Sequence, residues 1–304
     1  MKYKKKDPLV SIIMNCFNGE RYLNQALQSV LAQTYQNWEI IFWDNKSSDN
    51  SEKIFKSYSD NRFHYFSGEK HTILYEARNY ALSKCSGEII AFLDVDDVWF
   101  SKKLEIQVPL FNDTAVGFSC GNYIKLNEGK KNNINLKAKY FSLPNGKVLN
   151  ELFNENFVHM STLVIRNKAL NELKYFFDPR FEIIGDLDIL LRLSHWCNLA
   201  SVQQPIAYYR YHPNNTGLIK KKLIGTELKI LLNEIKDYPE YKNLSNFSKF
   251  KYSVKFYELL NLLYNGKKWN TLKQINSLKI IHRLKFLMAM FLPNRIIKIW
   301  IDRS

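Results

Sequence analysis

Cysteine is scarce in this chain of 304 residues, which has only four, and no two of them form a CxxC pair. Their spacing matches neither a zinc site nor the disulfide framework of a small secreted domain. No stretch reaches the roughly 18 uncharged apolar residues that a membrane-spanning helix needs. The apolar segment 9–14, behind the basic segment 1–6, is too short for the core of a signal peptide. These absences predict a protein of a reducing compartment that stays on the cytoplasmic side of the membrane.

Long disordered segments and a dinucleotide-binding fingerprint are missing too. Apolar residues make up 46% of the chain, which is enough for a real core. The length suits one large domain, or one domain with an appendage. No GxGxxG motif follows the first apolar run, so a dinucleotide-binding Rossmann domain is disfavoured.

Positive charge is concentrated at the C-terminal end of the chain. The net charge is +15, and residues 217–304 hold 18 Lys or Arg against 6 Asp or Glu, a net charge of +12. A basic tail of this kind favours a polyanion or an anionic membrane surface as partner. We therefore expect a main domain over residues 1–215 and a basic helical extension over 216–304 that associates with membranes.

Short apolar runs alternate with helical patterns over the first hundred residues. The predicted strands are residues 9–15, 38–43, 62–66 and 87–93, and the predicted helices between them are 22–31, 51–58 and 75–84. This alternation predicts a parallel sheet with crossover helices. Ligands bind at the carboxyl edge of such sheets, where we expect the polar loops 15–20, 44–49 and 94–97 to meet.

The pattern is looser beyond residue 97. The further predictions are strands at 117–125, 160–166 and 203–211, an exposed polar loop at 127–139, a helix at 188–196 and helical structure from about residue 219.

Three carboxylates lie within four residues behind the fourth predicted strand: Asp94, Asp96 and Asp97. Like charges this close raise one another's pKa unless a cation lies among them. Mg²⁺ and Mn²⁺ accept such oxygen ligands and complete their shells with water and phosphate oxygens. The alternative is a solvated turn in which an Asp caps a helix over residues 98–107. The position at the edge of the sheet favours the metal site, and the spacing excludes an EF-hand.

Ordered motifs extend across this first part of the chain, at residues 10–18, 22–35, 39–41, 44–49, 77–79 and 91–97. Through them the chain resembles the inverting family 2 glycosyltransferases of the GT-A fold, over about residues 8–215 and weakly between 115 and 180. The resemblance implies an α/β fold with a Rossmann-like, mostly parallel sheet flanked by helices and followed by the helical extension. It also implies Mn²⁺- or Mg²⁺-dependent transfer of a sugar from a nucleotide diphosphate to an acceptor hydroxyl. UDP is the expected nucleotide.

The same resemblance assigns the donor site. Asp44 matches the aspartate that reads the nucleotide base, usually uracil. Asn15, Phe17 and Asn18 match the loop that lines the nucleoside, and Arg78 matches a basic residue near the base.

The metal and diphosphate site is assigned in the same way. Asp94 and Asp96 match the two acidic positions of the DxD motif that binds metal, diphosphate and ribose, and Asp97 lies directly behind them. The predicted metal ligands are Asp96 and Asp97. His212, in a later segment that also resembles the family, is a further candidate ligand, and Arg210 is a candidate contact to the diphosphate.

Inverting transfer needs a general base that accepts the proton of the acceptor hydroxyl. Asp186 matches this position at the start of a helix, and Asp188 is the fallback. An aspartate at a helix start is also an ordinary cap. The chain departs from the family where Gly185 replaces a common Glu, and where Asn45 and Lys46 replace a common Asp and Gly.

The remaining questions concern partners. A lipid-linked or surface-polysaccharide precursor is the expected acceptor, and the expected location is peripheral, on the inner face of the cell membrane. Oligomer formation is left open. The alternatives are a catalytically inactive scaffold that binds sugar nucleotides, a nucleotidyltransferase and a basic nucleic-acid-binding protein. The last two are disfavoured, since the first loop lacks the Gly- and Lys-rich pattern for a triphosphate and no nucleic-acid-binding motif is present.

Overall fold

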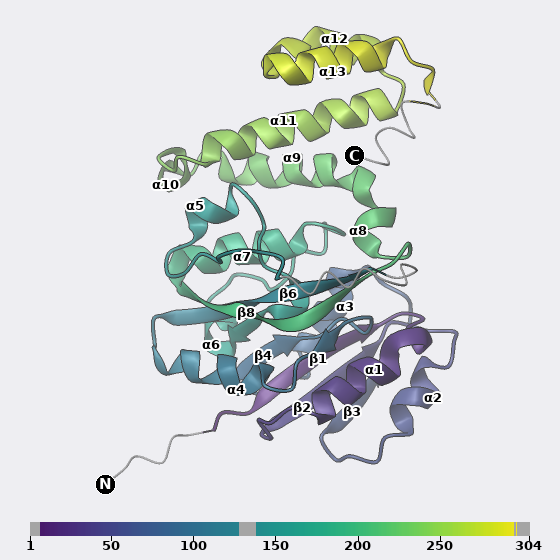
Figure 1. Ribbon diagram of the computed structural model, residues 1–304, viewed down its shortest axis with the longest axis vertical. Helices are drawn as coiled ribbons and strands as arrows, with labels where there is room; N and C mark the ends of the chain where they lie inside the picture. The colour runs from purple at the N-terminus through teal and green to yellow at the C-terminus, as the bar shows by residue number, and fades with distance from the viewer. Residues whose placement is uncertain (1–6, 128–137, 295, 297–304) are drawn as a thin grey trace. The chain divides into compact units, whose positions relative to one another are not determined.

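A computed structural model of the chain describes residues 7–127, 138–294 and 296 (Figure 1). The chain forms two compact units, one of residues 1–152 with 156–215 and one of residues 153–155 with 216–304. Three sequence predictions lie wholly or largely outside the described residues. They are the basic segment 1–6, most of the polar loop 127–139, and the end of the basic tail with Arg295 and Lys298.

A single sheet of eight strands, in the order β3-β2-β1-β4-β7-β6-β8-β5, runs through the first unit. β1 pairs in parallel with β2 and β4, β2 with β3, and β6 with β8, which confirms the predicted α/β fold with a largely parallel sheet. β7 runs antiparallel to β4 and β6, and β5 runs antiparallel to β8. The strands are β1 (Val10–Cys16), β2 (Trp38–Asp44), β3 (Phe63–Ser67), β4 (Ile89–Phe92), β5 (Val98–Trp99), β6 (Val116–Asn127), β7 (Val164–Arg166) and β8 (Asn198–Tyr211).

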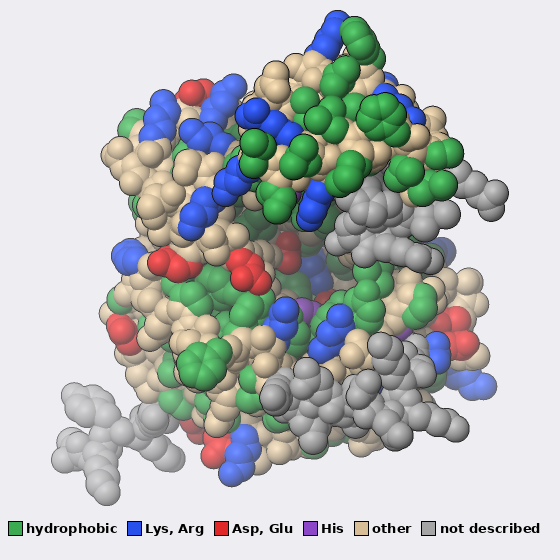
Figure 2. Space-filling view, turned by 45° about the horizontal axis from the view of Figure 1, so that its top comes forward, with side chains coloured by type: hydrophobic (Ala, Val, Ile, Leu, Met, Phe, Trp, Pro, Cys, Tyr) green, Lys and Arg blue, Asp and Glu red, His purple; other side chains and the backbone are tan. Residues whose placement is uncertain are grey.

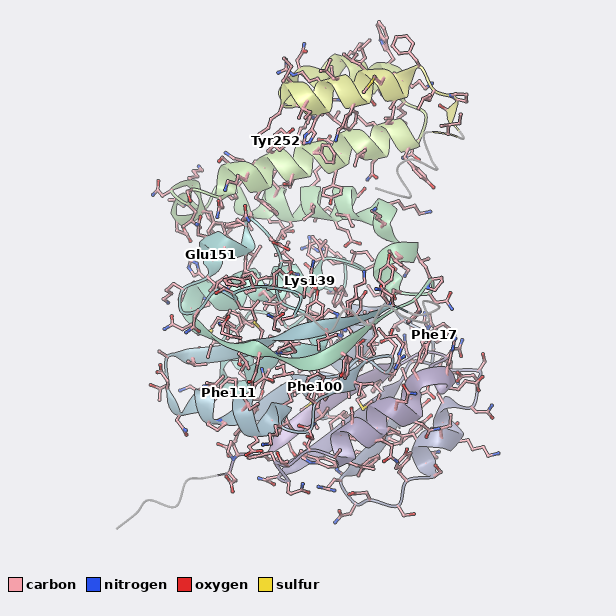
Figure 3. All side chains as sticks on the ribbon, viewed as in Figure 1. Phe17, Phe100, Phe111, Lys139, Glu151 and Tyr252 are labelled. Atoms are coloured by element: carbon pink, nitrogen blue, oxygen red, sulfur yellow. The ribbon has the colours of Figure 1, made fainter. Side chains whose placement is uncertain are left out.

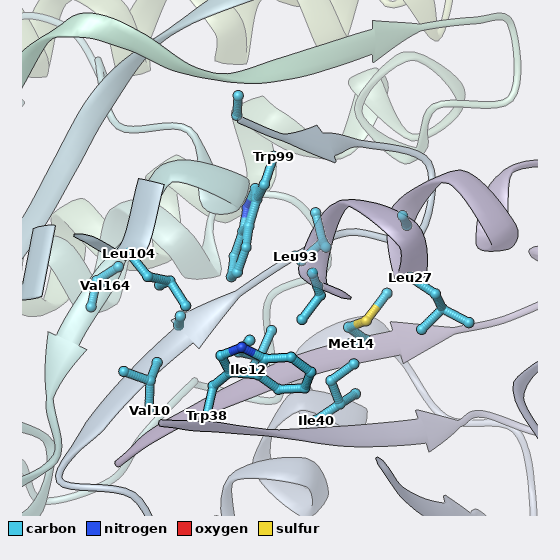
Figure 4. Close-up of a cluster of buried hydrophobic side chains, with 14 of the residues drawn as sticks. Val10, Ile12, Met14, Leu27, Trp38, Ile40, Leu93, Trp99, Leu104 and Val164 are labelled. Atoms are coloured by element: carbon cyan, nitrogen blue, oxygen red, sulfur yellow. The ribbon is translucent and has the colours of Figure 1, made fainter. Parts of the chain in front are cut away.

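Helices cover both faces of the parallel part of this sheet, which explains the nearly continuous apolar runs of β1 and β2. Ile12 and Met14 of β1 belong to the same buried cluster as Leu27 of the first helix (Figure 4). On the other face, Trp43 stacks on Tyr80 of the third helix, with ring centroids 5.1 Å apart. The helices of this unit are α1 (Glu20–Leu31), α2 (Ser51–Lys56), α3 (Leu74–Leu82), α4 (Lys103–Gln107), α5 (Leu149–Leu152), α6 (Asn167–Asn171) and α7 (Gly185–Trp196).

Two predicted elements of the first unit differ in the structure. The segment 98–107 is not one helix, because Val98 and Trp99 pair with β8 as strand β5 before α4 begins. The predicted strand 160–166 starts with a 3₁₀ turn, Met160–Thr162, and only Val164–Arg166 is extended. Val98 and Trp99 join the sheet through β8, and the 3₁₀ turn places Ser161 against Asp97; an apolar pattern reveals neither partner.

Helices make up the second unit, as the sequence predicts from about residue 219. Its core combines Leu259 and Leu263 of α11 with Ile275, Leu278 and Phe286. Across the described part of the chain, no helix combines the length and the apolar character needed to cross a bilayer. The helices are α8 (Thr216–Ile219), α9 (Ile224–Ile235), α10 (Pro239–Lys242), α11 (Phe247–Tyr264), α12 (Lys268–Gln274) and α13 (Ile280–Met290).

Candidate functional site

The three polar loops predicted to meet at the carboxyl edge of the sheet do so. The Asn18 N–H donates to Ser47 Oγ at 2.9 Å, and the Ser48 N–H donates to Asn18 Oδ1 at 2.8 Å, which joins the first loop to the second. The third loop reaches the first at Gly19, where an added Cβ would lie only 2.9 Å from Val95 Cγ2. Parallel pairing of β1 with β2 and β4 brings these loops together.

The end of β1 presents an unsatisfied amide and an exposed ring. Both polar atoms of the Asn15 side chain are buried and have no hydrogen-bond partner among the described residues. Leaving a buried polar group unpaired costs about 1–3 kcal/mol, so a ligand that pairs with it gains that difference. The Phe17 side chain, labelled in Figure 3, is 51% exposed. The centroid of its ring lies 4.1 Å from that of the His71 ring. Together they offer hydrogen-bonding and stacking groups of the kind a nucleoside needs.

Asp44, at the end of β2, is buried and accepts two protein hydrogen bonds. The Ser47 N–H donates to Oδ1 at 2.7 Å, and the Tyr65 hydroxyl donates to Oδ2 at 2.8 Å. A carboxylate has about four lone-pair positions, so Asp44 keeps acceptor capacity for a base N–H. Burial of the hydroxyl raises the pKa of Tyr65, and the hydrogen bond to Asp44 raises it further.

The departure from the family at Asn45 has a local reason. Its side-chain N–H donates to the Thr72 carbonyl at 2.7 Å, and its Oδ1 accepts from the Thr72 N–H at 3.1 Å. An ionised aspartate has no N–H to donate, so the amide fits this contact better than the carboxylate does. Lys46, the next departure, has a φ of +69°, a conformation that favours glycine.

Asp94 is held by a buried arginine. Arg78 of α3 donates from Nη2 to Asp94 Oδ1 at 2.8 Å, and the Arg78 side chain is only 3% exposed. The guanidinium carbon lies 5.4 Å from the centroid of the Tyr75 ring. An arginine fixed in this way carries positive charge into the acidic loop.

Asp96 contacts the predicted candidate ligand His212. The His212 Nε2 atom lies 2.9 Å from Asp96 Oδ2, and Asn215 Nδ2 lies 3.4 Å from the same oxygen. The Arg210 side chain donates to the Asp96 carbonyl and to Gln25 Oε1. Thus the structure brings β8 and the turn after it against the acidic loop.

Both oxygens of Asp97 are occupied by protein groups, and the residue is 1% exposed. The Ser161 hydroxyl donates to Oδ2 at 2.5 Å, and the Arg210 N–H donates to Oδ1 at 2.9 Å. These contacts anchor the acidic loop to β8 and to the 3₁₀ turn that holds Ser161. A metal would have to compete with both of them for this carboxylate.

The electrostatics of the acidic loop favour an added cation. Burial and the neighbouring Asp94 raise the pKa of Asp96, although His212 opposes the shift. Burial, together with Asp96 and Asp94, raises the pKa of Asp97 well above its usual range. A bound cation stabilises the ionised forms and reverses this cost.

The two candidate bases at the start of α7 have different surroundings. Asp186 is half-buried, accepts from the Leu187 N–H at 2.8 Å and from Asn156 Nδ2 at 3.2 Å, and burial raises its pKa. Asp188 is buried and pairs with Arg192 at 2.7 Å. The geometry therefore favours Asp186 as a proton acceptor and gives Asp188 a structural partner.

Gly185, where the family commonly has Glu, packs against an aromatic ring. A Cβ at this position would lie 2.6 Å from Tyr75 Cδ2 and Cε2. The Tyr75 hydroxyl donates to the Ile183 carbonyl at 2.9 Å, which fixes the ring against the start of α7. The absence of a side chain at Gly185 thus lets α3 approach α7 closely.

Sequence reasoning missed several polar and aromatic residues of this site, because they lie in the weakly patterned region or on late strands. They are Asn156, His159, Ser161 and Tyr209. Burial lowers the pKa of His159 to about 4, so its Nδ1 is free to accept from the Ser161 N–H at 3.3 Å. Burial and the nearby aspartates raise the pKa of Tyr209. The later family-like segment includes Tyr209 but gave it no role, and Asn156, His159 and Ser161 lie outside the family-like motifs.

The residues present fit a divalent cation that shares its ligands with a substrate. In the described part of the chain, no three His, Cys, Asp or Glu side chains form a metal site by themselves. Asp96 and His212 supply one oxygen and one nitrogen donor, which Mn²⁺ accepts. Water and phosphate oxygens commonly fill the remaining positions of such ions.

Comparison with known proteins gives a family and several relatives. Residues 11–174 match the family model described as glycosyl transferase family 2. The chain is 36% identical over 171 residues to the UDP-Glc:alpha-D-GlcNAc-diphosphoundecaprenol beta-1,3-glucosyltransferase WfgD of Escherichia coli, covering 56% of this chain and 65% of that protein. It is 36% identical over 118 residues to the putative teichuronic acid biosynthesis glycosyltransferase TuaG of Bacillus subtilis, covering 38% and 47%. The matches thus span about half to two thirds of these curated relatives.

Solved structures share the fold. TarS 1–349 of S. aureus superposes with a TM-score of 0.62 at 15% identity, over 97% of this chain and 89% of that one. The mannosyltransferase PcManGT of Pyrobaculum calidifontis gives a TM-score of 0.60 at 14% identity, over 98% and 85%.

Proposed function

Because the chain belongs to glycosyl transferase family 2 and has the GT-A fold, we propose that it transfers a sugar from a nucleotide diphosphate to an acceptor hydroxyl with inversion. The observation that carries the proposal is one chain of contacts at the carboxyl edge of the sheet. Arg78 binds Asp94 of the acidic loop and lies over the Tyr75 ring, and the same ring packs against Gly185, the residue before Asp186. The base and the loop for the leaving diphosphate therefore belong to a single site.

Asp186 is the general base in this proposal. Its carboxylate accepts the proton of the acceptor hydroxyl while the hydroxyl oxygen attacks the anomeric carbon of the sugar. The bond from that carbon to the diphosphate oxygen breaks, and the nucleotide diphosphate leaves. A raised pKa makes the carboxylate a better proton acceptor near neutral pH. Asn156 and the Leu187 N–H hold its two oxygens in place.

Asp96 and His212 would hold the divalent cation, Mn²⁺ or Mg²⁺, together with the donor diphosphate. A cation there supplies positive charge for the leaving group. Asp97, which the sequence also suggests as a ligand, is assigned a positioning role, since it already accepts from Ser161 and from the Arg210 N–H. Arg78 adds fixed positive charge beside Asp94.

The donor is proposed to be a UDP-sugar. The uracil ring would stack near Phe17 and hydrogen-bond to Asp44. The Asn15 side chain would gain the hydrogen-bond partners that it lacks. Asn18 shapes this loop by accepting from the Ser48 N–H. The name of the WfgD relative, which gives UDP-Glc as its donor, supports the choice.

The acceptor is proposed to be a sugar carried on a lipid diphosphate, as in a surface-polysaccharide precursor. The name of the WfgD relative gives a diphosphoundecaprenol acceptor, and that of TuaG refers to teichuronic acid. Both names come from matches of 36% identity over part of each protein.

A panel of sugar nucleotides tests the proposal. The full chain is incubated with each donor, an acceptor diphosphate lipid and Mn²⁺, and nucleotide diphosphate release is measured together with the glycosylated product. We expect turnover with a UDP-sugar and no turnover when EDTA removes the metal. The turnover rate of Asp96→Asn should be lower by about 100-fold or more, because metal-dependent charge stabilisation provides several kcal/mol. Asp237→Asn, an exposed position in the other unit, serves as the matched control.

Donor binding without turnover by any donor–acceptor pair would instead support the inactive scaffold. Equal activity of Asp96→Asn and the unaltered chain would contradict the metal assignment. Full activity in EDTA would contradict the need for a divalent cation.

A further inference from the structure

Helix α13 exposes a row of large apolar side chains. Ile280, Ile281, Leu284, Leu287 and Met288 lie in the helix and Phe291 directly follows it, and the six residues are between 36% and 89% exposed. Their spacing of three to four residues places them along one side of the helix. Apolar side chains in such a continuous row mark an interaction surface more often than scattered single ones do.

This row is not the side that stabilises the second unit. Phe286 and Ala289 of α13 are buried, in one cluster with Leu259 and Leu263 of α11. The helix is therefore apolar on two sides, and only one of them contributes to the core. The exposed side has no role in folding that the described contacts show.

The surroundings of the row carry charge of one sign. The segment 259–294 contains six Lys or Arg residues and no Asp or Glu. Lys273, Lys279 and Lys285 are exposed along it. Figure 2 shows hydrophobic and basic side chains interleaved on the face that carries α12 and α13.

We propose that the exposed side of α13 docks on the surface of an anionic phospholipid bilayer. The helix lies in the interface, its apolar row enters the boundary between headgroups and acyl chains, and the lysines meet the anionic headgroups. A second copy of the chain fits this face poorly, because a symmetric contact would bring the same lysines together. The proposal is independent of the donor chemistry.

Vesicle flotation of the full chain tests the proposal. Vesicles of phosphatidylcholine alone are compared with vesicles that also contain phosphatidylglycerol, at low and high salt. We expect flotation only with the anionic vesicles, weakened by salt because surface charges are screened. The double variant Met288→Ser/Phe291→Ser is expected to reduce the partition coefficient at least about tenfold, since it removes two side chains from the acyl boundary.

Control variants carry the same kinds of substitution at exposed positions of the first unit, so they test whether the location on α13 matters. Phe141→Ser/Trp196→Ser removes two side chains of the first unit that are 106% and 72% exposed, and it should float like the unaltered chain. Lys279→Gln/Lys285→Gln should bind anionic vesicles roughly tenfold or more weaker, and Lys53→Gln/Lys102→Gln in the first unit should not. Thermal melts of each variant establish that it is folded.

Three results would overturn the proposal. One is that the unaltered chain stays in the bottom fraction of the gradient with both kinds of vesicle. The second is equal flotation of Met288→Ser/Phe291→Ser and the Phe141→Ser/Trp196→Ser control. The third is light scattering that shows a dimer in the unaltered chain and a monomer in Met288→Ser/Phe291→Ser without a change in flotation, which would assign the face to a second copy.

Discussion

At the scale of single residues, two carboxylates on one turn of α7 differ in their partners. Asp188 is 3% exposed and bound by Arg192, which also donates to the carbonyls of Tyr175 and Phe176. Asp186 has only neutral hydrogen-bond donors and a raised pKa. Burial without a bound cationic partner leaves a carboxylate basic, and pairing with arginine does the opposite.

Replacing each aspartate by asparagine should separate catalysis from stability. Asp186→Asn is expected to lower kcat by about 10²–10⁴-fold with little change in the melting temperature, because it removes proton transfer. Asp188→Asn is expected to lower the free energy of unfolding by about 2 kcal/mol, since it leaves the partly buried Arg192 charge without its carboxylate. Steady-state kinetics and urea melts measure the two effects. Full turnover in Asp186→Asn would refute the base assignment.

The pH dependence follows from the raised pKa of Asp186. The base must be ionised, so kcat/KM should fall on the acid side with a midpoint above the ordinary aspartate value of 3.8. The folded state also binds this proton more tightly than the unfolded chain, so ionisation at neutral pH costs stability. Asp186→Asn should therefore be at least as stable as the unaltered chain at pH 7, and this difference should vanish below the unfolded pKa. A stability gap that instead grows with acid would contradict the direction of the shift.

Lys46 tests the loop after β2. Its φ of +69° is strained for a residue with a Cβ, so Lys46→Gly should raise the free energy of unfolding by about 0.5–1 kcal/mol. Asn18 has a φ of +54° but tolerates it better and also accepts from the Ser48 N–H. Asn18→Gly should therefore destabilise the protein where Lys46→Gly stabilises it, as measured by urea melts. Destabilisation by both would mean that the Lys46 side chain makes contacts that outweigh the strain.

At the scale of helices and strands, the approach of α3 to α7 depends on Gly185. Alanine in place of glycine usually stabilises a helix by about 0.5–1 kcal/mol. Here a Cβ would lie 2.6 Å from the Tyr75 ring, so Gly185→Ala should destabilise by about 1–3 kcal/mol. In a Tyr75→Ala background, the same change should be neutral or stabilising. A double-mutant cycle by urea denaturation measures the coupling, and additive effects would contradict the proposed contact.

Sequence patterns predicted the elements whose own residues form a clear apolar pattern. They missed the elements that exist through pairing with distant parts of the chain. β1 and β2 could be recognised because both of their faces are buried, which gives a nearly continuous apolar run. Ile12 and Trp43 lie on opposite faces of the sheet. β5 is two residues long and exists through its pairing with β8, so Val98 and Trp99 carry too little pattern to be recognised. The start of β7 was misjudged for a related reason, since Ser161 turns to reach Asp97.

At the scale of the whole molecule, the site could be predicted only as far as strand order carried it. Chain order placed Asn18 beside Ser47 and the acidic loop beside them, and the structure agrees. The contacts from Arg210 and His212 join residues more than a hundred positions apart, so only the family resemblance suggested them. His159 had neither a local pattern nor a family motif to point to it, and Tyr209 lies in the later family-like segment but had no role assigned to it.

The division into two compact units leads to a last prediction, which concerns how a bound ligand stabilises one unit and not the other. All members of the cluster around Leu259 and Phe286 belong to the second unit, and the donor-site residues belong to the first. A ligand that binds only the folded first unit at 100 times its dissociation constant stabilises that unit by about 2.7 kcal/mol. Amide exchange through unfolding of the first unit should then slow about 100-fold with UDP and Mn²⁺, measured by mass spectrometry.

Peptides from α11 and α13 should keep their exchange rates under the same conditions, because their core contains no donor-site residue. Anionic vesicles should give the reverse pattern, with protection in residues 267–294 and none in the loops at 15–20 and 44–49. Asp96→Asn is the control for the metal-dependent part of the first effect. Equal slowing in β1 and α11 with UDP and Mn²⁺ would show that the units unfold together, and the separation of donor binding from membrane binding would then have no thermodynamic basis.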